Sequence, residues 1–192
     1  MLYKFGRMLF FIYFRLLFRA RVEGAEHMPD EGPVILCANH ISLNDPMLIG
    51  CMLKRPVSFL AKAQLFRIPP ARKILTAMRA MPVDRDNPGM SSFKSAMAVL
   101  NAGGVLGIFA QGRRITLKEH DDGSIKSGVA LFALKSGATV LPVKITPRYR
   151  PFLPLTVKIA PPVDLSAFYG QKARSDVLRA AAAVIYDRVK EM

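Results

Sequence analysis

Short apolar runs alternate with helical patterns along most of this 192-residue chain. Strands are predicted at residues 33–39, 57–61, 81–84, 105–110, 139–145 and 155–159. Helices are predicted at residues 46–53, from 69 to about 79, and at 91–102, 129–136 and 174–190. Such alternation is typical of an α/β fold. We therefore expect a mostly parallel sheet that is flanked by helices.

The first 22 residues are both apolar and basic. They contain five basic residues and no acidic residue, and their longest uncharged stretch is seven residues. A membrane span needs ~20 apolar residues, and no cleavage site of a signal peptide follows. Four of the basic residues fall on one side of a helical wheel, which predicts an amphipathic helix lying in the membrane interface. The alternative is an ordinary helix packed on the folded domain, residues 23–192.

The net charge of the chain indicates which classes of partner it can attract. Lys plus Arg number 28 against 14 Asp plus Glu, which gives a net charge of +14. Such an excess attracts anionic lipid surfaces, phosphorylated substrates or nucleic acid. The sequence contains no aromatic RNA-binding motif, basic recognition helix or zinc knuckle, so nucleic acid is not expected. The two cysteines, Cys37 and Cys51, form no metal-binding spacing and are predicted to be small buried residues.

Three polar clusters lie at the carboxyl ends of predicted strands. They are Asn39 and His40 with Asp45, then Asp84 and Arg85, then residues 111–114. In open α/β sheets, ligands bind beyond the carboxyl ends of the strands. These clusters therefore predict one site built from residues that are far apart in the sequence.

His40 and Asp45 suit general-base chemistry. A histidine can remove a proton from an alcohol that attacks a carbonyl, and an aspartate on the other ring nitrogen fixes the tautomer. The spacing places His40 in a loop and Asp45 at the start of the next helix. Asp45 also precedes Pro46, so it could simply cap that helix. A pair at this spacing also arises easily by chance.

Basic residues lie near the same predicted strand ends. Residues 54–85 contain eight basic residues and a single acidic one. Arg85 and Arg114 stand out because each comes just after a predicted strand. Guanidinium groups and backbone N–H groups at such positions suit a phosphate.

Four motifs in order resemble those of the glycerolipid acyltransferases, especially the 1-acyl-sn-glycerol-3-phosphate acyltransferases. The NHxxxxD motif matches residues 39–45, and an Arg after a short apolar run matches residues 81–85, preceded by Lys62-Ala63-Gln64-Leu65-Phe66. The FPEGTR motif matches residues 109–114 loosely, and an apolar run through a Pro matches residues 140–143. The resemblance covers about residues 25–147.

The resemblance implies a reaction and a set of roles. His40 is expected to act as general base and Asp45 to orient it, transferring a fatty acyl group from acyl-CoA or acyl-carrier protein to 1-acyl-sn-glycerol-3-phosphate. The product would be phosphatidic acid, and no metal or other cofactor is expected. The acceptor phosphate is expected to be held by five basic residues, Lys62, Arg85, Arg113, Arg114 and Lys126. Gln111 and Gly112 are expected to line the acceptor site.

The third motif departs from the family pattern. Gln111 replaces a Glu, Ala110 a Pro and Arg113 a Thr, which makes this stretch more positive. The acceptor therefore stays open, with another lysolipid such as a lyso-ornithine lipid as an alternative. A further alternative is a non-catalytic, basic lipid-binding module. We expect the protein to lie on the anionic surface of the cytoplasmic face of the cell membrane, as a peripheral or monotopic protein.

Overall fold

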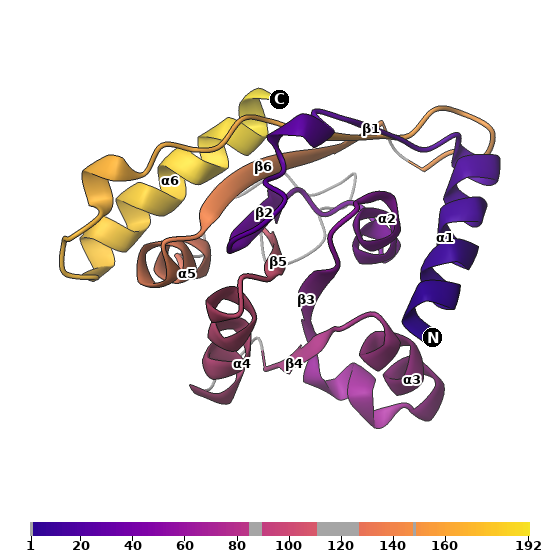
Figure 1. Cartoon of the computed structure of the whole chain (residues 1–192), viewed down its shortest axis with the longest axis horizontal. Coiled ribbons are helices and arrows are strands. Elements are labelled where there is room, and N and C mark those ends of the chain that lie inside the picture. Colours follow the sequence, from indigo (N-terminus) through magenta and orange to yellow (C-terminus); the bar gives the residue numbers. More distant parts are fainter. Residues whose placement is uncertain (1, 85–89, 111–126, 148) are drawn as a thin grey trace.

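A computed structural model of the chain describes residues 2–84, 90–110, 127–147 and 149–192. The described residues form a seven-stranded sheet in the order β1-β7-β6-β2-β5-β3-β4 (Figure 1). The strands are β1 (Arg21–Glu23), β2 (Val34–Ala38), β3 (Val57–Lys62), β4 (Met81–Val83), β5 (Val105–Phe109), β6 (Thr139–Thr146) and β7 (Thr156–Ile159).

Helices lie on both faces of this sheet (Figure 1). The α-helices are α1 (Leu2–Phe18), α2 (Asp45–Met52), α3 (Pro69–Ala77), α4 (Met90–Asn101), α5 (Gly128–Ser136) and α6 (Ser175–Glu191). The described part of the chain also contains three short 3-10 helices, η1 (Ala25–His27), η2 (Ala63–Arg67) and η3 (Ser166–Phe168).

Pairing in the sheet is parallel except between β6 and β7. The predicted fold, a mostly parallel sheet flanked by helices, is therefore confirmed. Strands β2, β5, β3 and β4 are neighbours in the sheet and run in the same direction. Their carboxyl ends consequently meet at a single edge.

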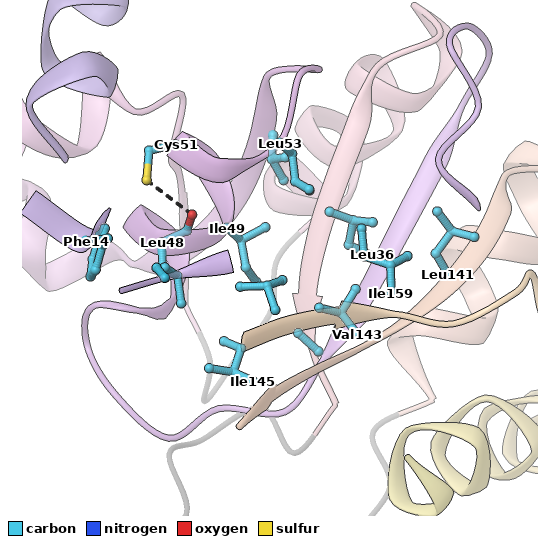
Figure 2. Close-up of a cluster of buried hydrophobic side chains, with 14 of the residues drawn as sticks. Phe14, Leu36, Leu48, Ile49, Cys51, Leu53, Leu141, Val143, Ile145 and Ile159 are labelled. Atoms are coloured by element: carbon cyan, nitrogen blue, oxygen red, sulfur yellow. Dashed lines mark hydrogen bonds between the residues drawn. The ribbon is translucent and has the colours of Figure 1, made fainter. Parts of the chain in front are cut away.

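The central strand β2 is buried on both faces, which explains its unbroken apolar run. Leu36 points into a core shared with α1, α2, β6 and β7, shown in Figure 2. Its neighbour Ile35 points into a second core, formed with α4, α5 and α6. Successive side chains of a strand alternate between its faces. The strand thus joins two hydrophobic cores, and its carboxyl end is held rigidly between them.

Helix α1 ends sooner than the sequence pattern suggested. The helix stops at Phe18, Arg19 takes a left-handed conformation with φ 43°, and the short strand β1 follows. Phe14 and Phe18 are buried in the core beside α2. Other apolar side chains of α1 are exposed, so the helix packs on the domain with one side only. No described helix is long and apolar enough to cross a membrane.

The two cysteines are buried and unpaired. Burial raises the pKa of the thiols of Cys37 and Cys51 to about 12. Almost no thiolate forms at neutral pH, so neither side chain is suited to act as a nucleophile. Both behave as small hydrophobic residues, as predicted from their positions in apolar runs.

Candidate active site

The loop between β2 and α2 brings His40 and Asp45 together. His40 follows the carboxyl end of β2, and Asp45 is the first residue of α2. The Nδ1 atom of His40 lies 2.7 Å from Oδ2 of Asp45, and the two residues are 6% and 0% exposed. This geometry is the one expected from the sequence. It leaves Nε2 of His40 as the ring nitrogen that can accept a proton.

The carboxylate of Asp45 accepts four hydrogen bonds from the described residues. Oδ2 accepts from the backbone N–H groups of Ile41 and Ser42, at 2.7 and 2.8 Å, as well as from His40. Oδ1 accepts from the hydroxyl of Tyr149 at 2.8 Å. A buried carboxylate needs such partners to offset its lost hydration. Because Oδ2 already accepts two N–H groups, Nδ1 of His40 is best assigned as a donor.

Asp45 does not cap helix α2, which was the alternative explanation of its position. The residue before the helix is Asn44, and its side chain makes no capping hydrogen bond. The Asp45 side chain instead turns back to the preceding loop, which supplies three of its four hydrogen-bond partners among the described residues, the fourth being Tyr149. The carboxylate therefore organises the loop and the imidazole of His40.

The imidazole of His40 is also held by stacking. Its ring lies 3.9 Å from the ring of Phe109, centroid to centroid, with an angle of 16° between the planes. Phe109 stacks in turn on Phe59 at 5.8 Å. A Cβ atom at Gly107 would overlap the Phe59 ring. The absent side chain at Gly107 thus leaves room for the two rings that support His40.

Asn39 joins the end of β2 to β6. Its side-chain amide donates to the carbonyl of Ile145 at 3.1 Å, and its side-chain oxygen accepts from the Ile145 N–H at 2.7 Å. The side chain thereby substitutes for a backbone peptide and extends the pairing of the two strands by one step. His40 is the next residue, so its backbone starts from a fixed point.

Tyr149 is a site residue that the sequence did not reveal. It lies 104 positions from Asp45 in the chain, after β6, and its hydroxyl donates to Asp45. Burial, and then the negative charge of Asp45, raise the pKa of Tyr149 above its ordinary value. No motif includes this residue, and its only signal in the sequence is its place beyond the end of a predicted strand.

The structure describes only some of the residues that were expected to bind the phosphate. Lys62 is exposed at the carboxyl end of β3, the same edge at which His40 follows β2. Arg85, Lys126 and residues 111–114 (Gln111, Gly112, Arg113 and Arg114) lie outside the described residues. The neighbours Asp84 and Ala110 stand just after β4 and β5, at this edge.

No group of three or more His, Cys, Asp or Glu side chains that could hold a metal ion occurs in the described part of the chain. The expectation that the reaction needs no metal remains a prediction. The pair of His40 and Asp45 can serve as a proton acceptor without one.

The family model for acyltransferases matches residues 19–146, about two thirds of the chain. The chain belongs to the acyltransferase family. It is 28% identical over 142 residues to the 1-acyl-sn-glycerol-3-phosphate acyltransferase of Bacillus subtilis (strain 168), covering 73% of this chain and 69% of that protein. It is 32% identical over 126 residues to the protein of the same name from Borreliella burgdorferi, covering 65% of this chain and 50% of that protein.

A solved structure supports the same assignment. The crystal structure of the 1-acyl-sn-glycerophosphate (LPA) acyltransferase PlsC from Thermotoga maritima matches with a TM-score of 0.62 and 27% identity. The match covers 100% of this chain and 78% of that one. The expected family and fold, and the expectation of an acyltransferase enzyme, are confirmed.

The role of Asn39 in this acyltransferase can be tested with Asn39→Ala. The change leaves the N–H and the carbonyl of Ile145 without their partners, so we expect a loss of stability on the order of 2 kcal/mol. Urea denaturation measures it. Asn101→Ala, at the exposed end of α4, is the matched control and should stay within about 0.5 kcal/mol of the unmodified protein. Equal stability of both variants would contradict the strand-joining role.

Proposed function

We propose that this acyltransferase moves a fatty acyl group from acyl-CoA or acyl-carrier protein to the free hydroxyl of 1-acyl-sn-glycerol-3-phosphate. The observation that carries the proposal is the hydrogen bond between His40 Nδ1 and Asp45 at the carboxyl edge of the sheet. The names of the two bacterial relatives and of the Thermotoga maritima structure support the choice of acceptor. The product is phosphatidic acid.

The proposed mechanism has one proton acceptor. Nε2 of His40 takes the proton of the acceptor hydroxyl while its oxygen attacks the thioester carbonyl. Asp45 stabilises the imidazolium that forms, through the hydrogen bond to Nδ1. When the tetrahedral intermediate collapses, the C–S bond breaks and the proton passes from His40 to the leaving thiolate. An ester and a free thiol result, with no covalent enzyme intermediate.

The acceptor phosphate is proposed to bind at the edge where the strands end. Lys62 stands at this edge, at the end of β3. In the sequence, Arg85 comes soon after β4, Arg113 and Arg114 come soon after β5, and Lys126 comes shortly before α5. Gln111 and Gly112 are proposed to complete the acceptor site. A different lysolipid is the second candidate acceptor, because Gln111 and Arg113 make this stretch more positive than the family pattern.

The reaction can be tested with labelled acyl-CoA and labelled acyl-carrier protein against a panel of acceptors. We expect most product with 1-acyl-sn-glycerol-3-phosphate, and little with monoacylglycerol, which lacks the phosphate. His40→Ala should lose nearly all turnover, at least about 1000-fold, because the proton acceptor is gone. Thin-layer chromatography with mass analysis identifies the product.

His27→Ala is the control for this experiment. His27 lies in η1, where its Nδ1 atom contacts the carbonyl of Ile159 at 3.0 Å, and this variant should keep the turnover of the unmodified enzyme. Full turnover in His40→Ala would overturn the mechanism. A larger product yield with a lyso-ornithine lipid would replace the acceptor, and no product with any acceptor would favour the non-catalytic lipid-binding module.

An apolar cavity beside α2 suits a fatty acyl chain. It has a volume of about 360 Å³ and lies between α1, α2 and α3, with a lining that includes Phe5, Leu9, Phe10, Met47, Ile74 and Met78. Gly50 of α2 also lines it, about 8 Å along the helix from Asp45 at 1.5 Å per residue. Ligand pockets are concave and mostly apolar, as this one is. We propose that it receives an acyl chain of the donor or of the acceptor.

Gly50→Leu tests the cavity. A Cβ atom at Gly50 would have only the end of Met78 within 4 Å, at 3.9 Å, so the larger side chain can enter the cavity. We expect kcat/KM to fall about tenfold for long-chain substrates and to change little for short ones. Gly50→Ala, which leaves most of the cavity open, is the control. Separate series of donors and acceptors show which chain is shortened, and an equal loss for all lengths would contradict the proposal.

Helix α1 is proposed to lie on an anionic membrane surface at the cytoplasmic face of the cell membrane. Its exposed apolar side chains include Phe5, Met8, Leu9, Phe11, Ile12 and Leu16. Phe152 adds to this surface, because it is exposed and its N–H bonds to the carbonyl of Leu17. Lys4 and Arg15 are exposed on the same helix. Arg7 donates to the carbonyls of Cys51, Leu53 and Lys54 at the end of α2, and Arg15, although exposed, donates to the carbonyl of Ala20.

Vesicle flotation tests this surface. The double variant Leu16→Asp/Phe152→Asp should bind phosphatidylglycerol vesicles at least about tenfold more weakly, because two apolar contacts become charged. Val184→Asp is the matched control, since Val184 is exposed on α6, at the opposite end of the molecule (Figure 1). Binding should also weaken with salt and on neutral vesicles. Equal binding of both variants would exclude α1 as the contact surface.

A further inference from the structure

The four hydrogen bonds to Asp45 come from two places in the chain. Three donors, His40, Ile41 and Ser42, belong to the loop that leads into α2. All three bond to Oδ2. The fourth donor is Tyr149, which reaches Oδ1 at 2.8 Å. Among the residues that the structure describes, Tyr149 is thus the partner that holds the carboxylate from outside its own loop.

The ring of Tyr149 takes its position from helix α1. It packs edge to face on Phe18, with centroids 5.4 Å apart and an angle of 84°, and lies 6.3 Å from the ring of Phe14. Both phenylalanines are buried in the core. Aromatic rings in such pairs have preferred orientations. The hydroxyl of Tyr149 is therefore aimed at Asp45 by contacts with α1.

The hydroxyl of Tyr149 remains a donor under working conditions. Burial, followed by the charge of Asp45 and the hydrogen bond to it, raises the pKa of Tyr149. The proton therefore stays on the oxygen well beyond neutral pH. Oδ1 accordingly keeps its partner throughout the pH range in which a histidine base works.

We propose that Tyr149 is a positioning residue of the acyl transfer reaction, acting through Asp45 on His40. By holding Oδ1, its hydroxyl fixes the rotation of the carboxylate, so that Oδ2 stays directed at Nδ1 of His40. Because the Nδ1–H group of His40 is held by Asp45, the other ring nitrogen, Nε2, stays free and directed at the acceptor hydroxyl. This inference rests on the proposed role of His40 as general base. It also connects α1, the proposed membrane-contacting helix, to the reacting groups.

Tyr149→Phe tests the inference, because it removes the hydroxyl and keeps the ring that packs on Phe14 and Phe18. Small misplacements of catalytic groups cost up to about 100-fold. We expect kcat to fall about 10- to 100-fold, while KM for the donor and for the acceptor stays within about twofold. Steady-state kinetics with acyl-CoA and 1-acyl-sn-glycerol-3-phosphate give both constants.

Tyr186→Phe is the matched control. Tyr186 of α6 is also buried, in the core on the other face of the sheet, and its hydroxyl has no hydrogen-bond partner among the described residues. This variant loses the same atom and should keep kcat and KM. Thermal melting of both variants checks that each is folded at the assay temperature.

A double-mutant comparison separates positioning from a general loss of structure. If Tyr149 acts through Asp45, Tyr149→Phe should lower kcat far less in the Asp45→Asn background than in the unmodified enzyme. Equal losses in both backgrounds, or a raised KM with unchanged kcat, would overturn the inference. So would unmodified kinetics in Tyr149→Phe. That outcome alongside an inactive His40→Ala leaves the base in place, whereas an active His40→Ala overturns the proposed mechanism itself.

Discussion

The buried carboxylate of Asp45 is the constraint on which the site depends. A charged group without exposed surface is stable only when its lost hydration is replaced, and here four hydrogen bonds replace it. The donors come from the β2–α2 loop and from Tyr149. The loop shape, the start of α2 and the orientation of His40 are therefore set by one side chain. Removing any of these donors would leave the buried carboxylate of Asp45 with one hydrogen bond fewer to offset its lost hydration.

The sheet supplies the rigidity that this arrangement needs. Strand β2 is buried between two cores, and Asn39 ties its end to β6. Phe109, at the end of the adjacent strand β5, stacks on His40. Catalytic groups placed on rigid elements keep their geometry better than groups on free loops.

The parts of the site predicted from the sequence are those with local causes. His40 and Asp45 are five positions apart, at a strand end and a helix start, so their contact follows from local structure. Tyr149 was missed because its contact with Asp45 depends on the course of the chain after β6, which no local pattern records. Strand β1 was missed for a similar reason. It has three residues with charged ends and exists by pairing with β7.

Helix α1 shows that the two interpretations of the N-terminal segment are compatible with each other. Its apolar residues exceed what one buried stripe requires, because some of them serve the core and others form a surface. Phe14 and Phe18 pack on α2 and Tyr149, while Leu16 between them is exposed. A membrane that holds the exposed side would hold the buried side in the same orientation. Contact with lipid and the orientation of the histidine would then depend on one rigid helix.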